Sequence, residues 1–182
     1  MNTVEARVHG LILEHKTQQN IVVLREVDGL RILPIWIGPG EAQAIRRILS
    51  EEPFPRPLTH DLLHIIVEGL KAKIERVVIA DLRENTFFAS VIVQRGEDIL
   101  SVDARPSDSI AIALRAKAPI FVNDKLLQTP PKEGEGEAAA GEGEGEGASE
   151  EPRRALTDEE KAEQLRRYLE DMDPEDFGKF QM

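Results

Sequence analysis

Hydrophobic and polar residues alternate, or form short apolar runs, in seven stretches of this 182-residue chain. Alternation with period two is typical of a half-buried strand, and a short continuous apolar run is typical of a buried one. Asp28-Gly29 and Glu84-Asn85 stand between such stretches and predict turns. Pro34 indicates an edge position or a bulge. Strands are therefore predicted over residues 4–14, 21–24, 30–37, 73–82, 86–94, 99–102 and 119–122.

Three further stretches place apolar residues every three to four positions, which predicts helices. The first covers residues 41–49, the second runs from 59 to 69, and the third starts at Arg105-Pro106. Thr59 is predicted to cap the second helix, because Thr and Ser hydroxyls accept hydrogen bonds from free backbone N–H groups. The predicted buried stripes are Ala42, Ile45, Ile48 and Leu49 in the first helix, and Leu62, Leu63, Ile66 and Leu70 in the second.

The predicted elements follow one another in the order β-β-β-α-α-β-β-β-α-β, with a last helical turn at 123–127. Runs of strands followed by helices favour an α+β fold with a mostly antiparallel or mixed sheet and three main helices. The composition is 41% hydrophobic but only 4% aromatic, so the core must consist of Ile, Val and Leu. One domain over residues 1–128 is predicted.

The remaining chain has a different composition. Residues 129–152 are rich in Gly, Glu, Pro and Ala, and such a segment buries too little apolar surface to fold, so a disordered linker is predicted. Within residues 153–182, Thr157 and Glu160 form a capping-box pattern that starts a short amphipathic helix. A helix this short is marginal alone, so it is expected to dock on its own domain, on a second subunit or on another protein.

Charge and cysteine content narrow the functional classes. Residues 1–128 hold 16 Lys and Arg against 17 Asp and Glu, a net charge of −1, whereas residues 129–182 hold 7 against 17, a net charge of −10. The acidity of the whole chain therefore leaves a local nucleic-acid site open. The absence of cysteine excludes disulfides and thiolate metal sites. No signal-peptide pattern or membrane-spanning run is recognisable, so a cytoplasmic protein without membrane contact is expected.

Two stretches share an arginine and a proline just before a hydroxyl residue, an acid and an apolar run. They are Arg56-Pro57-Leu58-Thr59 and Arg105-Pro106-Ser107-Asp108. A helix N-terminus carries partial positive charge and free donors, so Arg56, Arg105 and Ser107 are predicted to hold a phosphate or carboxylate. The alternative for Arg105 is a local ion pair with Asp103 or Asp108 that fixes the loop.

Acidic residues cluster near the same helix starts. Clustered carboxylates can hold divalent ions such as Mg²⁺ or Mn²⁺, and Asp103 with Asp108 is the candidate metal pair here. The alternative is that each acid complements a helix dipole. The candidate acids are Glu41, Asp61, Asp103 and Asp108.

His60 and His64 are four residues apart and share a helix face with Glu68. This spacing mimics a zinc site, but the residue after His60 is Asp rather than Glu and no third ligand is recognisable. His60 is instead a candidate acid–base group. Trp36, the only tryptophan, is predicted in the core or an interface rather than stacked on a base.

Three motifs together resemble the bifunctional nuclease domain family, in the order in which that family carries them. They are Leu33–Gly38 with Glu41-Ala42, Arg56–Leu63 and Asp103–Arg115, and the resemblance covers about residues 4–127. It implies an α+β fold, self-association, and activity on both DNA and RNA. His60 lies within the second of these motifs.

Two functions follow from the sequence. The leading hypothesis is a nuclease, assisted by a divalent ion, in which Arg56, Arg105 and Ser107 hold phosphate and the acids and His60 perform the chemistry. The rival is a non-catalytic oligomeric module that senses an anion or nucleotide at the same helix starts. The near-neutral domain and the lack of a basic groove favour the rival. In both, a homo-oligomer and a protein partner for the C-terminal helix are expected.

Overall fold

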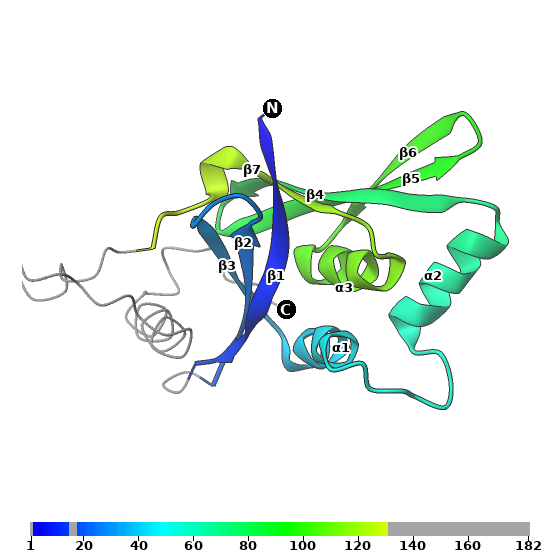
Figure 1. Cartoon of the computed structure of the whole chain (residues 1–182), viewed down its shortest axis with the longest axis horizontal. Helices are drawn as coiled ribbons and strands as arrows, with labels where there is room; N and C mark the ends of the chain where they lie inside the picture. Colours follow the sequence, from blue (N-terminus) through cyan, green and yellow to red (C-terminus); the bar gives the residue numbers. More distant parts are fainter. Residues whose placement is uncertain (1, 15–17, 131–182) are drawn as a thin grey trace, which may run out of the picture.

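A computed structural model describes residues 2–14 and 18–130 of the chain. These residues form seven strands and three α-helices, in the element order predicted from the sequence. Figure 1 shows how the elements are arranged. The elements are β1 (Thr3–Leu13), β2 (Asn20–Glu26), β3 (Ile32–Ile37), α1 (Pro39–Leu49), α2 (Thr59–Gly69), β4 (Lys73–Arg83), β5 (Thr86–Arg95), β6 (Asp98–Ala104), α3 (Pro106–Ala116), β7 (Ile120–Asn123) and the 3₁₀ turn η1 (Asp124–Leu126).

All seven strands belong to one sheet, in the order β3-β2-β1-β7-β4-β5-β6. Two antiparallel meanders, β1–β2–β3 and β4–β5–β6, are joined by the short strand β7. β7 pairs antiparallel with β1 and parallel with β4. The predicted α+β class with a mostly antiparallel, mixed sheet and three main helices is therefore confirmed.

Local sequence explains how the strands begin and end. Glu84 and Asn85 have φ of 47° and 60°, the left-handed pair that a tight hairpin between β4 and β5 requires. Pro34 lies in β3, an edge strand, where a missing backbone N–H costs no ladder bond on the open side. The predictions for this turn and for the edge position are both confirmed.

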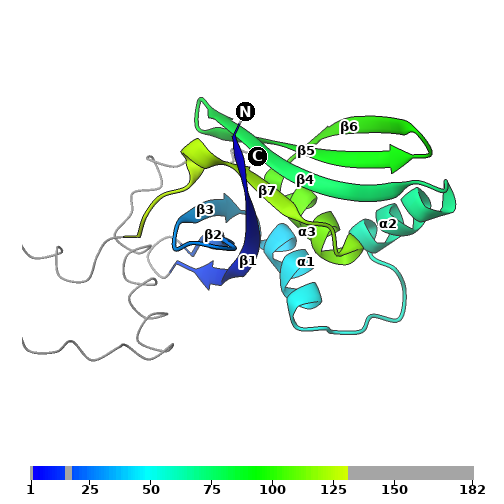
Figure 2. The same ribbon diagram turned by 45° about the horizontal axis from the view of Figure 1, so that its top comes forward.

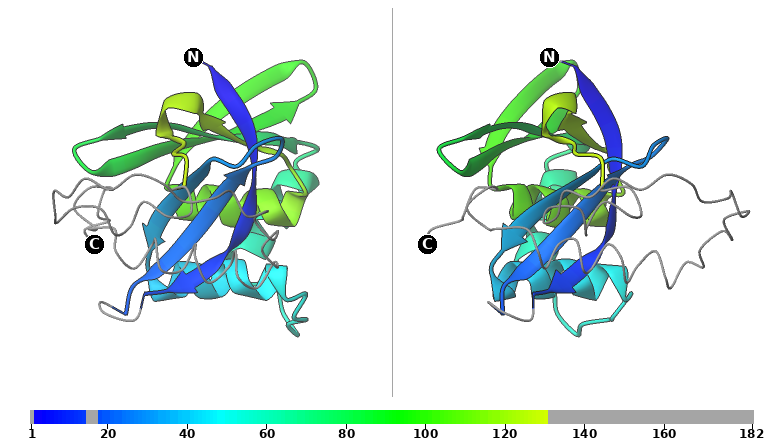
Figure 3. Two further views of the ribbon diagram at one scale, coloured as in Figure 1. Left: turned by 60° about the vertical axis from the view of Figure 1, so that its left-hand side comes forward. Right: turned by 90° about the vertical axis from the view of Figure 1, so that its left-hand side faces the viewer.

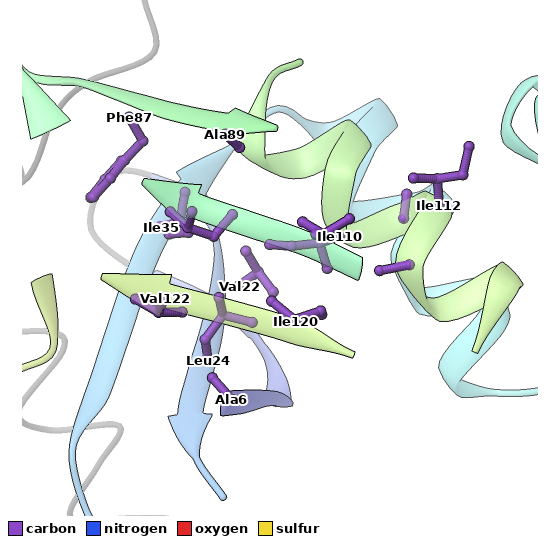
Figure 4. Packing of buried hydrophobic residues seen from close by; sticks show 14 of the residues in the cluster. Ala6, Val22, Leu24, Ile35, Phe87, Ala89, Ile110, Ile112, Ile120 and Val122 are labelled. Carbon is purple, nitrogen blue, oxygen red and sulfur yellow. The ribbon is translucent and has the colours of Figure 1, made fainter. Parts of the chain in front are cut away.

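The helices lie on the concave side of the twisted sheet, with α3 in the middle (Figures 1 and 3). The main core is aliphatic, as the low aromatic content requires. Ile110 of α3 is fully buried and points toward Val22 and Ile120 of the sheet (Figure 4). Burial of such a side chain contributes about 1.5–3 kcal/mol.

Trp36 belongs to a second, smaller cluster with Ile21, Val23 and Ile32. Ile21 and Val23 alternate along β2 with Val22, which lies in the main core, so the second cluster occupies the opposite face of the sheet. The Trp36 side chain is buried there, on the face away from the three helices. The prediction that Trp36 is a core or interface residue is confirmed.

Two predictions about the helices are wrong. Thr59 is the first residue of α2, and its N-cap is Leu58, because Asp61 reaches back to the Leu58 N–H and satisfies it. The predicted buried stripe of α2 is exposed, because the helix turns its polar side toward α3 instead. In α1, Ala42 and Ile45 are buried as predicted, whereas Leu49 is exposed.

The predicted tail helix and nearly all of the predicted linker lie outside the described residues. The last described residues are Thr129 and Pro130, which follow an isolated bridge between Gln128 and Ile32 of β3. Among residues 2–14 and 18–130, no helix is both long and apolar enough to cross a membrane.

Candidate functional site

A cleft of about 410 Å³ opens between α1, the start of α2 and α3. α3 packs against both of the other helices, so it forms the shared wall. The lining residues are Gly40, Glu41, Gln43, Ala44 and Arg47 from α1, Leu58, Thr59 and His60 from the start of α2, and Arg105, Asp108 and Arg115 at α3.

Prolines explain where two of the helices that line this cleft begin. Pro39 and Pro106 occupy first-turn positions of α1 and α3, where their missing N–H costs nothing. A residue before proline is restricted to extended conformations, and Arg105 has φ −63° and ψ 145°. The Arg105 backbone therefore stays outside the helix, and its guanidinium can reach both α1 and the first turn of α3.

A chain of polar contacts crosses the cleft. His60 Nε2 lies 3.0 Å from Asp108 Oδ1, and Arg105 Nε donates to Asp108 Oδ2 at 2.7 Å. Arg105 Nη1 also lies 3.0 Å from Glu41 Oε1. Asp108 thus joins a histidine from α2 to an arginine at the start of α3, and that arginine reaches α1. Three helices are coupled through four side chains.

A second contact ties α2 to α3. Asp61 Oδ2 accepts the Leu58 N–H at 2.8 Å, and its Oδ1 accepts a hydrogen bond from Arg115 Nε. Arg115 Nη1 donates to the Ala111 carbonyl at 3.0 Å within α3. The Arg115 side chain is only 6% exposed, so its charge is held away from water and needs the Asp61 partner.

These contacts hold the two aspartates in their charged form. Burial of Asp108 would raise its pKa, but hydrogen bonds and charges from Arg105 and His60 outweigh burial, so its pKa is lowered. Burial opposes ionisation of Asp61 in the same way, and its bonds from Leu58 and Arg115 again lower its pKa. The bond to Asp108 raises the pKa of Arg105. At neutral pH the cleft therefore contains paired, fully ionised groups.

The donors of the cleft favour an anion. Its lining includes three arginines and two carboxylates, and Asp61, the partner of Arg115, adds a third carboxylate beside it. The lining also includes the first turns of α1 and α2, whose N–H groups carry partial positive charge. Arg47 stacks over Phe54 with its guanidinium carbon 4.8 Å from the ring centroid. Guanidinium groups of this kind match the geometry of phosphate oxygens.

The structure brings together most of the residues that the sequence singled out. Glu41, His60, Arg105 and Asp108 line the cleft, and Asp61 contacts the lining residue Arg115. The predicted local ion pair between Arg105 and Asp108 is present, and it coexists with a position in the cleft wall.

Three other candidates lie outside the lining. Asp103 is exposed on β6, where it pairs across the sheet with Ser90. Arg56 is exposed in the connection before α2. Ser107 is buried at 3% exposure in the first turn of α3. The roles predicted for these three residues stay predictions.

The carboxylates at the cleft already have charged partners. Glu41 and Asp108 both contact Arg105, and Asp61 contacts Arg115, so their oxygens already face guanidinium groups. Within residues 2–14 and 18–130, no group of three or more His, Asp or Glu side chains is close enough to hold a metal. The two histidines of the zinc-like spacing also have different partners. His64 lies 3.6 Å from Glu68, whereas His60 contacts Asp108.

Sequence reasoning missed two of the arginines. The sequence gives no functional signal for Arg47, because a basic residue in the last turn of a helix complements the dipole. Arg115 stands inside the third motif, but its partner Asp61 is 54 residues away along the chain. The signal available for Arg115 is a charged residue directly after the apolar run 110–114, since a charge beside the core needs a partner.

Comparison with known proteins gives one family and two groups of relatives. The family profile described as "Bifunctional nuclease domain" matches residues 22–133. A protein of Mycobacterium tuberculosis, described as uncharacterized, is 39% identical over 173 residues, which cover 95% of this chain and 97% of that protein. Bifunctional nuclease 1 of Oryza sativa subsp. japonica is 26% identical over 130 residues, covering 69% of this chain and 39% of the plant protein. Bifunctional nuclease 2 of Arabidopsis thaliana is also 26% identical, over 69% of this chain and 40% of its own length.

Proposed function

The chain belongs to the bifunctional nuclease domain family, and on that premise we propose that its cleft hydrolyses phosphodiester bonds in DNA, RNA or both. The observation that carries the proposal is the contact chain from His60 through Asp108 and Arg105 to Glu41, in a cleft that three arginines line. It joins an acid–base group to an anion-binding group at one place.

Arginines bind and orient the phosphate in this proposal. Arg47 and Arg105 both line the cleft, Arg47 from α1 and Arg105 from the position just before α3. Donors fixed on both sides of a phosphate stabilise the negative charge that builds up on its oxygens in the transition state. Arg105 is held by Glu41 and Asp108, so its position is set before the substrate arrives.

His60 is proposed as the general base. Asp108 orients the imidazole, as a carboxylate does in other histidine-based sites, and it stabilises the imidazolium that forms. His60 takes a proton from the attacking water as the new P–O bond forms. The bond to the leaving oxygen then breaks, and that oxygen receives a proton from the imidazolium or from solvent.

The remaining sequence predictions are compatible with this proposal, but the proposal does not depend on them. Arg56 and Ser107 as phosphate ligands, Asp61 as a catalytic group, and Asp103 with Asp108 as a metal pair stay predictions. Mg²⁺ or Mn²⁺ assistance, a cytoplasmic location and a protein partner for the C-terminal segment also stay predictions. Self-association is proposed here as well, and the nucleic acid is the substrate.

A cleavage assay tests the proposal with a matched pair of histidine variants. His60→Gln is expected to lower cleavage of labelled single- and double-stranded DNA and RNA by roughly 10²- to 10⁴-fold, the usual contribution of general base catalysis. His64→Gln is the control, because His64 lies one turn further along α2 and outside the cleft lining. It is expected to cleave like the parent.

The same assay with and without EDTA tests metal assistance separately. Loss of cleavage in EDTA would support the metal prediction, and unchanged cleavage would support the arrangement of residues described above. Equal loss in His60→Gln and His64→Gln, or no cleavage by the pure parent chain, would refute the proposed mechanism. Thermal stabilisation by nucleotides without any turnover would instead favour the binding module.

A further inference from the structure

One face of strands β2 and β3 is buried although the helices lie on the other side of the sheet (Figure 3). The four large side chains of the second cluster are 0–3% exposed, and Pro34, which pairs with Val23 on the same face, is buried as well. Within residues 2–14 and 18–130, Ile12 is the one partly buried apolar residue that packs against this cluster. The four residues, called the outer face below, are Ile21, Val23, Ile32 and Trp36.

Burial to this extent needs a cover. Successive side chains of a strand point to opposite faces, so a sheet with helices on one side commonly has its other side in water. A tryptophan such as Trp36 buries about 150–250 Å² when it is packed, and monomers rarely expose a patch of several such side chains. The exposed fractions hold for one copy of the chain, so the cover belongs to the same chain.

We propose that the C-terminal segment, residues 153–182, docks on the outer face through the apolar stripe of its predicted helix. The residues of the stripe recur at spacings of three and four, so they share one side of that helix. A helix this short gains most of its stability by packing its apolar side against another surface. The outer face is an apolar surface of matching size. The stripe consists of Leu165, Tyr168, Leu169 and Met172.

The path of the described chain leads to this surface. The Ile32 N–H donates to the Gln128 carbonyl at 2.8 Å, and the Gln128 N–H donates to the Ile32 carbonyl at 2.8 Å. Ile32 belongs to the outer face, so the C-terminal segment starts at the border of that face. A flexible chain with the length and the Gly-rich composition of residues 129–156 is expected to span roughly 26–32 Å. That reach exceeds the width of β3, β2 and β1, because neighbouring strands are about 4.8 Å apart.

Charge also favours this occupant. Arg7 and Arg25 lie directly opposite each other on β1 and β2, and Arg25 shares a face with Val23 of the outer face. Like charges in such a position destabilise a strand pair. No acidic side chain of residues 2–14 and 18–130 pairs with either arginine, and Arg25 Nε donates to the Gly29 carbonyl at 3.4 Å. Residues 156–177 carry nine Asp and Glu against three Lys and Arg, a net charge of −6. The segment therefore complements the outer face in charge as well as in apolar surface.

Trp36 reports on its own cover, because it is the only tryptophan of the chain. In the full-length parent, its emission is expected at short wavelength, and acrylamide is expected to quench it weakly. Leu169→Glu puts a charge in the stripe and is expected to shift the emission to longer wavelength and to raise the quenching constant severalfold. Arg167→Glu is the matched control, because residue 167 lies on the far side of the predicted helix from the stripe. It is expected to behave like the parent.

Energy transfer gives a second readout that needs no destabilising charge. Tyr168 is the only tyrosine of the chain, so any tyrosine contribution to the excitation spectrum of Trp36 comes from the proposed stripe. Transfer falls steeply with distance. The parent is expected to show a tyrosine contribution that Tyr168→Phe removes while the protection of Trp36 from acrylamide remains. Circular dichroism of each variant would verify that it folds.

The two arginines test the contribution of charge. Arg7→Gln combined with Arg25→Gln removes a repulsive pair, so without a docked acidic segment it is expected to leave the protection of Trp36 unchanged. With the segment docked, it is expected to raise the quenching constant, and the difference from the parent is expected to shrink in high salt because salt screens exposed charges. An unchanged quenching constant at low salt would contradict the proposed role of the arginines.

Three outcomes would overturn the proposal. Free quenching of Trp36 in the parent would show that the outer face has no cover, and protection by added DNA or RNA would then assign it to nucleic acid. Protection that falls on dilution would assign it to a second copy of the chain. Protection that Leu169→Glu leaves intact at every concentration would exclude the stripe. None of these readouts involves cleavage, so loss of cleavage in His60→Gln with normal protection of Trp36 would separate this contact from the proposed function.

Discussion

α2 and α3 are helices of equal length that both line the cleft, yet they are held in opposite ways. α3 has seven buried residues among its eleven, and α2 has none. α3 combines Ile110 and Ile112 with Ser and Ala residues, whose small side chains let it approach the sheet closely. α2 contains larger aliphatic residues around a wide arc, and it contacts α3 with its polar side.

This difference in burial gives α2 and α3 different roles in the site. Asp108 and Arg115 are fixed by a helix that belongs to the core, so their positions are set by folding of the whole domain. His60 and Asp61 are fixed mainly by their ionic contacts with those same two residues. The contacts that build the site are therefore the same contacts that attach α2 to the domain. A substitution in the site is expected to loosen α2.

The largest effect is expected from a substitution in α3, the helix that belongs to the core. Ile110→Ala removes a fully buried side chain and leaves a cavity between α3 and the sheet, at an expected cost of 2–5 kcal/mol in the free energy of unfolding. Leu30→Ala, at an exposed position, is expected to stay within about 0.5 kcal/mol of the parent. Urea denaturation followed by circular dichroism measures both. Equal costs at the two positions would contradict the buried position of α3.

The strands, the hairpin turn and the start of α3 are predictable from the sequence because each depends on local pattern. Period-two alternation, the Glu84-Asn85 pair and Pro106 each act within a few residues. The buried side of α2 was not predictable in this way. Its apolar residues do form one stripe, but the pattern of an isolated chain does not tell whether a stripe faces the core or a second molecule.

The sequence predicts several residues that belong to the site, but it does not predict which of them contact one another. The helix-start motifs indicated Arg105, Asp108 and His60, because prolines and acids at helix starts are local signals. His60 and Asp108 are 48 residues apart, and their contact depends on how α2 packs against α3. Arg47 shows the same limit, since its place in the cleft follows from the packing of α1 against α3.

An intermediate effect is expected where the two helices meet. Arg115→Met keeps much of the side-chain volume but leaves Asp61 without its guanidinium partner, at an expected cost of about 1–3 kcal/mol. Hydrogen exchange is expected to speed up in α2 and to change little in α3. Arg83→Met is the control, because Arg83 is 70% exposed in its pair with Asp81, and such pairs contribute about 0–1 kcal/mol. Faster exchange in both helices would show that α2 and α3 open together.

The smallest effect is expected from pH, and it tests whether the ionic contacts hold α2 as described. The folded protein lowers the pKa of Asp61 and Asp108, so the unfolded chain takes up protons first as pH falls below the ordinary value of about 3.9. Their stabilisation is therefore complete above that pH and is lost as pH falls through the lower folded pKa values. Because about a third of each side chain is exposed, water screens the effect and keeps it below that of Arg115→Met.

Asp61→Asn and Asp108→Asn resolve this pH dependence into its parts. Each variant is expected to be less stable than the parent at pH 7, and to lose less stability than the parent between pH 5 and pH 3 in urea denaturation. Asp103→Asn removes one exposed carboxylate on β6 and is the control, with a profile expected to match that of the parent. A parent-like profile in Asp61→Asn would mean that α2 is held by something other than its ionic contacts.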